Sequence, residues 1–183
     1  MGMYILLLSL GMLFASGLLG YVVIRVEDSE VWPPPGMSGL PWLLVISTFL
    51  IVISSGSMWF ANRSAINGSR KALQAWMLIT LVLGLSFLVF QVLAWLEMSE
   101  GKASFTEHLY AWSFYFLTAL HAAHLIGGLI PMLIVTARSF GKGYSPENHR
   151  GVTYLGMYWH FLDRAWVLLF LTLIWGSGGA FGS

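Results

Sequence analysis

The 183-residue chain has no cysteine, few charged residues and almost no excess of either charge. The absence of cysteine excludes disulfides, thiolate zinc sites, iron–sulfur clusters, covalently attached c-type haem and a cysteine nucleophile. Only 9% of the residues are charged and 57% are hydrophobic, whereas soluble domains have about 25% charged residues. A soluble domain could not cover its surface with so few ionic groups. The composition therefore indicates an integral membrane protein.

The charged residues that are present are scattered along the chain. The net charge is +1, and the nine Lys and Arg residues form no run of five or more. Nucleic-acid-binding segments usually show such a run or a marked basic excess. We therefore expect no nucleic-acid partner. The chain also has no internal repeat and no low-complexity tract beyond a short proline run at residues 33–35.

Five apolar runs are long enough to cross a bilayer as helices, since a hydrocarbon core of about 30 Å needs about 20 apolar residues. They cover residues 3–24, 40–60, 75–96, 109–137 and 152–176, with turn-forming or charged residues between them. We predict an all-α integral membrane protein, a bundle of five transmembrane helices forming one transmembrane domain over residues 1–183. The first run has no basic region ahead of it and is long for a signal peptide, so we expect it to be retained.

The basic residues predict the orientation of this bundle. Two loops, after the second and fourth runs, hold six of them: Arg63, Arg70, Lys71, Arg138, Lys142 and Arg150. The opposite side holds only Arg25 and Lys102. Because basic loops stay in the cytoplasm, we predict a cytoplasmic N-terminus and an outer C-terminus. The acidic residues near the helix ends then face outward: Glu27, Asp28, Glu30, Glu97, Glu100 and Glu107.

Tryptophan is concentrated near the ends of the predicted helices, as is typical of the interfacial belt of membrane proteins. Eight residues fit this interpretation: Trp32, Trp42, Trp59, Trp76, Trp95, Trp112, Trp159 and Trp175. Trp166 lies deeper, and we expect it to pack between helices.

Five ionisable residues fall inside the predicted spans, where such groups are costly and often functional. His121 and His124 share one face of the fourth helix, and His121 lies roughly 17 Å along it, near the midplane. In the fifth helix His160 is followed by Asp163 and Arg164, whose side chains point about 100° apart. Since an unpaired buried charge is expensive, we expect these residues to form an interhelical hydrogen-bonded network.

A haem or metal site is one alternative for these residues. Two axial histidines must lie on opposite sides of a haem plane, so His121 with His160 makes a better pair than His121 with His124. Such a pair would make the chain a haem-binding membrane anchor. A transporter or channel acting alone is a second alternative, because Pro131 with Gly127 and Gly128 could break the fourth helix, although no repeat accompanies them.

The fifth run carries a distinctive motif. Residues 158–163 read YWHFLD, Trp166 follows, and residues 175–177 read WGS. This resembles the C-terminal signature of subunit III of haem–copper oxidases, the cytochrome c and quinol oxidase family. Residues 118–124, TALHAAH, are similar to the family's T-G-x-H-G-x-H. Leu40-Pro41, Gln91 and Asn148-His149 fit the same pattern, which extends from about residue 40 to residue 177.

The resemblance implies the short, five-helix form of subunit III, an accessory subunit with no catalytic residue and no haem or copper of its own. Haem and copper are then expected in the partners, catalytic subunit I and subunit II. It also implies bound phospholipid, support of proton uptake and of complex stability, and a place in the bacterial cytoplasmic (inner) membrane. His121, His124, His160, Asp163 and Arg164 become a structural, lipid-related or proton-related polar network. The subunit III-like protein of nitric oxide reductases is an alternative within the same resemblance.

Three positions depart from the family pattern. Leu10 and Ala94 stand where the family usually has carboxylates, and Arg164 stands where a small or aliphatic residue is usual. A lipid or proton role that requires those two carboxylates is not carried over to this chain.

Overall fold

The computed structural model describes residues 1–28, 32–35, 39–100, 108–141 and 144–181, and five long helices dominate them. The helices are α1 (Gly2–Glu27), α2 (Leu43–Ile66), α3 (Arg70–Glu100), α4 (Leu109–Phe140) and α5 (Arg150–Gly176). Each is long and apolar enough to cross a membrane. The prediction of an all-α membrane protein with five spanning helices is confirmed.

The helices do not end where the apolar runs end. Residues 61–74, which lie between the second and third apolar runs, are mostly helical, and the connection is reduced to 67–69, because polar side chains can continue a helix beyond its hydrophobic stretch. Gly68, at φ +70°, ends α2, and the N–H groups of Gly68 and Ser69 donate to the carbonyls of Ala65 and Ser64 at 3.2 and 2.9 Å. This is a Schellman motif, which needs a left-handed residue that glycine supplies without strain.

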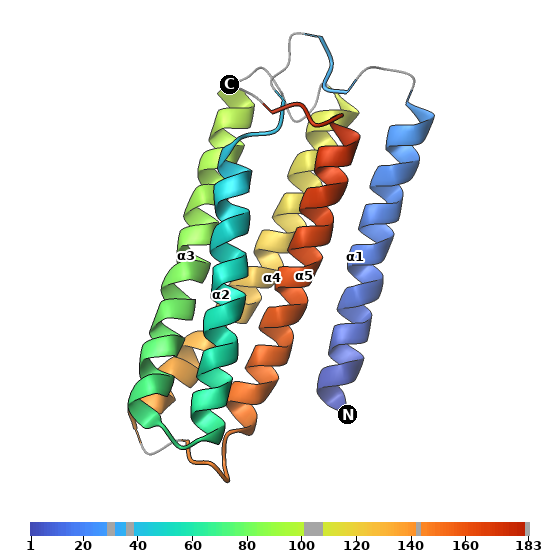
Figure 1. Cartoon of the computed structure of the whole chain (residues 1–183). Coiled ribbons are helices and arrows are strands. Elements are labelled where there is room, and N and C mark those ends of the chain that lie inside the picture. The colour runs from blue at the N-terminus through green and yellow to red at the C-terminus, as the bar shows by residue number, and fades with distance from the viewer. Residues whose placement is uncertain (29–31, 36–38, 101–107, 142–143, 182–183) are drawn as a thin grey trace.

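Helix α5 contacts α1, α2 and α4, whereas α3 contacts α2 and α4. Figure 1 shows α2 and α3 side by side at one edge of the bundle and α1 at the other, with α4 and α5 between them. Of the other four helices, α1 contacts only α4 and α5. The two chain ends lie at opposite ends of the bundle (Figure 1), as an odd number of spans requires.

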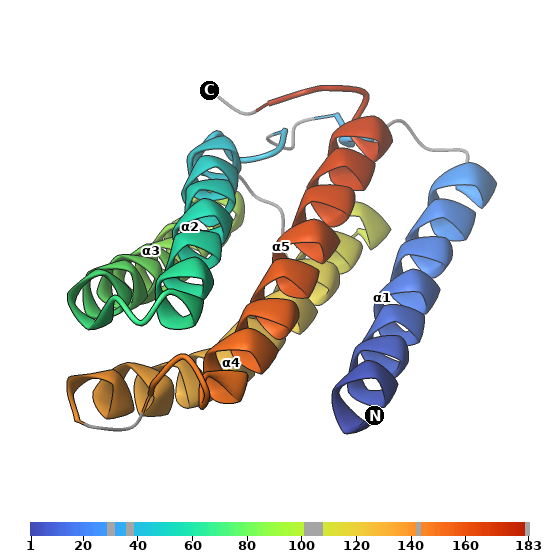
Figure 2. The same cartoon turned by 60° about the horizontal axis from the view of Figure 1, so that its bottom comes forward.

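Helix α4 is bent, and its last turns swing away from α5 (Figure 2). Pro131 lies inside it and cannot donate to the carbonyl four residues earlier, which is a common cause of a helix kink. The bend brings the end of α4 to the first turn of α3. There Arg70 Nε and Gln74 Nε2 donate to the Ser139 carbonyl at 3.3 and 2.9 Å, and Arg70 also donates to the Phe140 carbonyl. These bonds satisfy carbonyls that a helix end leaves free.

The C-terminal segment folds back over the chain that precedes α2. The Leu40 N–H donates to the Ala180 carbonyl at 2.9 Å, and Phe181 packs edge-on against Trp42 with ring centroids 5.5 Å apart. A Cβ added to Gly39 would lie only 2.5 Å from the carbonyl oxygen of Ala180. The two segments therefore meet backbone to backbone.

Apolar side chains occupy both the core and the outer faces of the bundle. The largest fully buried side chains are Trp159, Trp166, Tyr110, Phe87 and Phe114. Large hydrophobic residues are also exposed along every helix, for example Leu8 on α1 and Phe49 on α2 at 66% each. Contiguous exposed apolar surface of this kind marks a membrane or protein interface.

Candidate functional site

His121 lies at the centre of an aromatic cluster. Its side chain is fully buried, and neither ring nitrogen has a hydrogen-bond partner among the described residues. The rings of Trp166, Phe87 and Phe14 lie 4.9, 5.6 and 6.1 Å from it, centroid to centroid. Three other helices thus contribute to its surroundings: α1, α3 and α5.

His124 shares one of these neighbours but has its own hydrogen bond. Its Nδ1 bonds to the Leu120 carbonyl at 2.7 Å within α4, and its ring lies 5.3 Å from that of Phe14. The His124 carbonyl accepts a hydrogen bond from the Tyr158 hydroxyl of α5 at 2.9 Å. Tyr158 packs so closely on α4 that a Cβ on Gly128 would meet its ring at 2.7 Å. The His124 turn is thus a point of close approach between α4 and α5.

His160 faces a different helix. Its Nδ1 and the Ser55 Oγ of α2 are hydrogen-bonded at 2.7 Å, and the ring is half-buried. Asp163, one turn further along α5, is only 4% exposed. Its carboxyl oxygens have no hydrogen-bond partner within the described ranges, although Ser55 and Arg164 are near enough to act on it electrostatically.

Arg164 is the outlier of the set because its side chain is exposed. It lies near the middle of α5, about 21 Å along the axis from Arg150 and about 18 Å from Gly176 at a rise of about 1.5 Å per residue. An arginine at the centre of a spanning helix costs about 2.5–3.5 kcal/mol on insertion scales. In the part of the chain that is described, Arg164 makes no hydrogen bond or ion pair that would offset this cost.

The five residues therefore lie in two groups. His121 and His124 face the aromatic side chains of α1, α3 and α5, while His160, Asp163 and Arg164 lie along the seam between α5 and α2. The hydrogen bonds of the described residues do not join the two groups into one network. Any coupling between them runs through packing, in particular through Trp166, which neighbours Asp163 in helix α5 and contacts His121.

Sequence reasoning missed the polar seam that joins α2 to α5. Indole N–H groups of Trp166 and Trp159 donate to Thr48 Oγ1 and Ser54 Oγ at 3.0 and 2.9 Å. The Thr153 hydroxyl donates to Asn62 Oδ1 at 3.0 Å. With Ser55 and His160, these pairs follow one another in antiparallel register along the two helices. The signal in the sequence was the spacing of small hydroxyl residues along the second apolar run.

The belt interpretation is wrong for two tryptophans. Trp159 is fully buried ten residues into α5, and Trp32 is 4% exposed. Trp32 packs edge-on against Tyr21 and Tyr110, at 5.7 and 5.5 Å, beneath the Arg25 guanidinium at 5.3 Å. Both indoles are needed to fill space between helices and have hydrogen-bond acceptors there, Ser54 and Asp28. Trp166 packs between helices, as expected from its depth.

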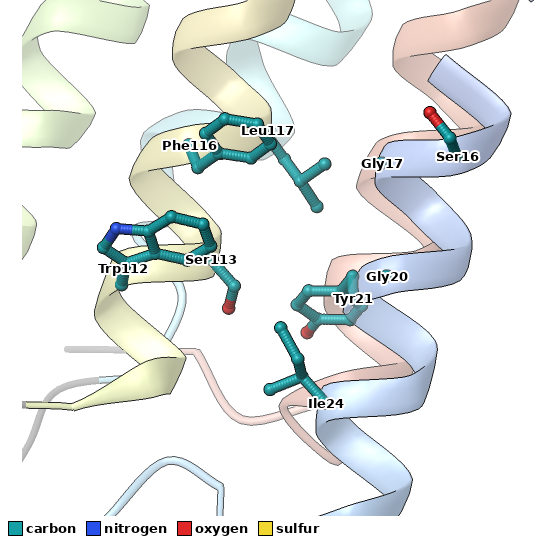
Figure 3. A pocket seen from close by; sticks show the side chains of 9 residues that line it. All are labelled: Ser16, Gly17, Gly20, Tyr21, Ile24, Trp112, Ser113, Phe116 and Leu117. Carbon is teal, nitrogen blue, oxygen red and sulfur yellow. The ribbon is translucent and has the colours of Figure 1, made fainter. Parts of the chain in front are cut away.

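A groove separates α1 from α4. Figure 3 shows its walls, with Gly17, Gly20 and Tyr21 on α1 opposite Ser113 and Leu117 on α4. Its volume is about 300 Å³ and its lining is mainly apolar. Glycines on α1 open this space, since a side chain at position 17 would come within 3.2 Å of Leu117.

The surroundings of His121 do not fit a haem. Three aromatic rings lie within 6.1 Å of the imidazole and occupy the space that a macrocycle beside it would need. His160 is engaged with Ser55 and belongs to the other group. Within the described ranges, no three His, Asp or Glu side chains are placed to hold a metal ion. The pairing of His121 with His160 as axial ligands has no geometric support.

Five apolar helices with ionisable side chains packed between them define a multi-pass integral membrane protein. The sequence model of cytochrome c oxidase subunit III matches residues 1–177, and the chain belongs to this family.

Individual relatives agree with the family match. The chain is 34% identical over 172 residues to cytochrome c oxidase subunit 3 of Synechocystis sp., covering 93% of this chain and 72% of the relative. It is 29% identical to the protein of the same name from Thermostichus vulcanus, covering 94% and 85%. For the Marchantia polymorpha protein the identity is 32%, and the alignment covers 84% of this chain but only 57% of the relative.

Proposed function

We propose that this chain is the accessory subunit III of a haem–copper respiratory oxidase and carries no redox centre itself. The observation that carries the proposal is the match to the subunit III family over residues 1–177. The catalytic complex would reduce oxygen to water in a four-electron reaction coupled to proton pumping. This chain would support that reaction by packing on the catalytic subunit, by stabilising the complex and by helping proton uptake.

Its partners in this proposal are catalytic subunit I and subunit II, which hold the haem and copper. The outward apolar faces of all five helices support an assembled state, because some of this surface can be covered by protein as well as by lipid. The relatives are named as subunits of cytochrome c oxidase. If the chain is found with a nitric oxide reductase instead, the alternative applies, and the chain is the subunit III-like protein of that enzyme.

The proposed location is the bacterial cytoplasmic membrane, with the N-terminus inside. The α2–α3 connection, the end of α4 and the start of α5 carry the basic residues, and they lie at the same end of the bundle as the N-terminus (Figure 1). Basic loops favour the cytoplasmic side. Glu30, Lys102, Glu107 and Lys142, which also entered the charge count, lie outside the described residues.

The five intramembrane polar residues are proposed to have structural, lipid-related or proton-related roles. His121 and His124 would hold α1, α4 and α5 at a defined spacing, and His160 and Asp163 would do the same for α2 and α5. The groove between α1 and α4 (Figure 3) is suited to a phospholipid acyl chain, because its lining is apolar and about 300 Å³ is available.

A gentle affinity purification of the tagged chain from native membranes tests the proposal. We expect a large haem-bearing subunit to co-purify, and its identity separates oxygen from nitric oxide chemistry. Recovery of the chain alone, under conditions that keep other respiratory complexes whole, would contradict it.

Deletion of the chain gives a second, independent readout. The haem spectrum of the remaining complex should be largely retained, because the haem is held elsewhere. Activity during sustained turnover should decay faster than in the complete complex. Loss of the haem spectrum itself would instead indicate that this chain helps to bind haem.

A further inference from the structure

Arg164 is a cation near the middle of the membrane-spanning helix α5. Its side chain is exposed at the middle of α5, and no residue in the described part of the chain forms an ion pair or hydrogen bond with it. Asp163 is near enough to act on Arg164 electrostatically, but the two side chains leave the helix about 100° apart, Asp163 is 4% exposed, and they form no direct ion pair. The described residues therefore leave Arg164 without a direct ion-pair partner, and another molecule can supply one.

A pocket lies beside this charge. It is bounded by α2 and α5, has a volume of about 460 Å³, and is lined by Val52, Ser55, Asp163, Arg164, Val167 and Leu168. Its walls are almost entirely apolar, and its polar groups all come from the three residues Ser55, Asp163 and Arg164. The buried carboxyl of Asp163 has no hydrogen-bond partner among the described residues. The pocket thus combines an unpaired cation with an unsatisfied buried polar group.

The depth of Arg164 separates two candidate counter-charges. Lipid phosphates lie outside a hydrocarbon core whose half-thickness is about 15 Å. Arg164 lies about 18–21 Å along the axis from either end of α5, so its position is near the centre of the span. An acidic side chain on a neighbouring transmembrane helix can stand at that depth, whereas a phosphate cannot reach it without thinning the bilayer.

We propose that the α2–α5 pocket receives a transmembrane helix of a partner subunit, and that an Asp or Glu carboxylate of that helix pairs with Arg164 near mid-membrane. The proposal rests on the proposed function, since it assumes assembly with other oxidase subunits. Pairing of buried ionisable groups across helices is the usual way in which spanning segments accommodate them.

The surface around Arg164 suits a helix as the occupant. Leu168, Leu171 and Trp175 follow Arg164 at spacings of four, three and four residues and are 58%, 55% and 56% exposed. They form one stripe along α5, and Val52 of α2 borders it at 50% exposure. A partner helix laid along this stripe would bury apolar surface at the same time as it neutralises the charge.

The first test measures assembly. Arg164→Leu, Arg164→Lys and a control, Arg150→Leu, are compared in the tagged full-length chain in native membranes. Arg150 is the exposed first residue of the same helix. For Arg164→Leu we expect at least about a tenfold loss of co-purified partner, because the partner carboxylate is left unpaired. Arg164→Lys should retain much of the assembly, and Arg150→Leu should match the wild type.

The amount of tagged chain in the membrane serves as the folding control. Arg164 has no ion pair within the described chain, so Arg164→Leu should insert and accumulate as the wild type does. Reduced accumulation of the variant, in step with reduced co-purification, would show a role in the fold of this chain and would overturn the proposal.

The second test locates the partner. The chain has no cysteine, so Leu168→Cys creates a unique thiol at the rim of the pocket. Leu133→Cys on α4, 52% exposed, is the matched control. With a short photoactivatable thiol-linked crosslinker, Leu168→Cys should crosslink to a partner subunit at a helix that carries a mid-membrane Asp or Glu. Crosslinking at least as strong from position 133 would remove the preference for this face.

The outcomes separate this inference from the proposed function. If the wild-type chain co-purifies with its partners but Arg164→Leu leaves assembly unchanged, the inference fails and the accessory role stands. If Arg164→Leu instead removes a tightly bound phospholipid, counted per chain by mass spectrometry, a lipid is the counter-charge and the inference is overturned. A crosslink between two copies of this chain also overturns it. If the wild-type chain recovers no partner, both proposals fall together.

Discussion

The contact between α2 and α5 and the contact of α1 with the bundle differ in chemistry. Four side-chain hydrogen bonds connect α2 to α5, and the indoles of Trp159 and Trp166 are fully buried between helices. Helix α1 buries only Leu10, Phe14 and Tyr21 and leaves a groove against α4. Its one hydrogen bond to α5 runs from Arg25 Nε to the Gly176 carbonyl at 2.8 Å.

The difference shows two ways of holding helices together where water is absent. Between α2 and α5 the hydroxyls of Thr48 and Ser54 donate to their own helix and accept from an indole of the other, so these hydroxyl and indole groups are satisfied in only one register. Between α1 and its neighbours, small residues allow backbones to approach and little else fixes the register. We therefore expect the α2–α5 seam to be the more stable and the more specific of the two.

The largest expected effect comes from removing Trp159. Trp159→Ala should lower the free energy of unfolding by about 3–5 kcal/mol, because it empties a fully buried site and leaves Ser54 without its donor. Denaturant titration of the purified chain in detergent measures the change. Trp175→Ala, at a position 56% exposed, is the control and should have a much smaller effect. Equal losses for the two variants would contradict the importance of the seam.

The next effect falls on α1. A Cβ at Gly176 would overlap the ring and hydroxyl of Tyr21. Gly176→Ala should therefore displace α1 at a cost of about 1–3 kcal/mol, as is typical of overpacking. Hydrogen exchange should rise in α1 while α2 stays protected. Protection lost equally in both helices would mean that α1 is not the weaker contact.

A smaller effect isolates one hydrogen bond of the seam. Ser54→Ala removes the acceptor of the Trp159 indole without opening a large cavity. The expected loss is about 0.6 kcal/mol, the average found for hydrogen bonds between membrane helices, and at most about 1.7 kcal/mol. In a double-mutant cycle with Trp159→Phe, the two changes should be clearly non-additive. Strict additivity would show that this bond does not contribute to the stability of the seam.

The smallest effect should be a gain. Gly20 is on the groove side of α1, and a Cβ there would have no neighbour within 4 Å. Gly20→Ala should stabilise the chain by about 0.5–1 kcal/mol, because alanine loses less backbone freedom in a helix than glycine does. Gly17→Ala is the contrasting variant, since its Cβ would come within 3.2 Å of Leu117. A loss of stability in Gly20→Ala would mean that the groove is narrower than the structure shows.

The sequence was sufficient for the parts of the fold that depend on one helix at a time. Apolar runs predicted the five spans, and the spacing of His121 and His124 placed them on one helix face. The location of His121 and Asp163 inside membrane-spanning helices followed from their depth in these runs. Such features depend on helix geometry and on the exclusion of water, which act locally.

Pairing between helices could not be predicted in the same way. The bond between Ser55 and His160 joins residues 105 positions apart, and the bond of Trp166 to Thr48 joins residues 118 apart. Trp159 was wrongly assigned to the interfacial belt, because its distance from the end of an apolar run does not show which face of the helix its side chain occupies. Its burial depends on the space that Gly84 leaves, where a Cβ would meet the indole at 2.8 Å.

The contacts of α1 also bear on the order in which the chain is made. Helix α1 is made before the other four helices described, yet among them it contacts only α4 and α5, and its hydrogen bond to Gly176 needs the last residue of α5. By contrast, α2 and α3 can pair as soon as both are inserted. During synthesis α1 therefore lacks its contacts with α4 and α5 until those two helices have been inserted. An early nucleus of α2 and α3 and a late docking of α1 are the assembly sequence that this topology imposes.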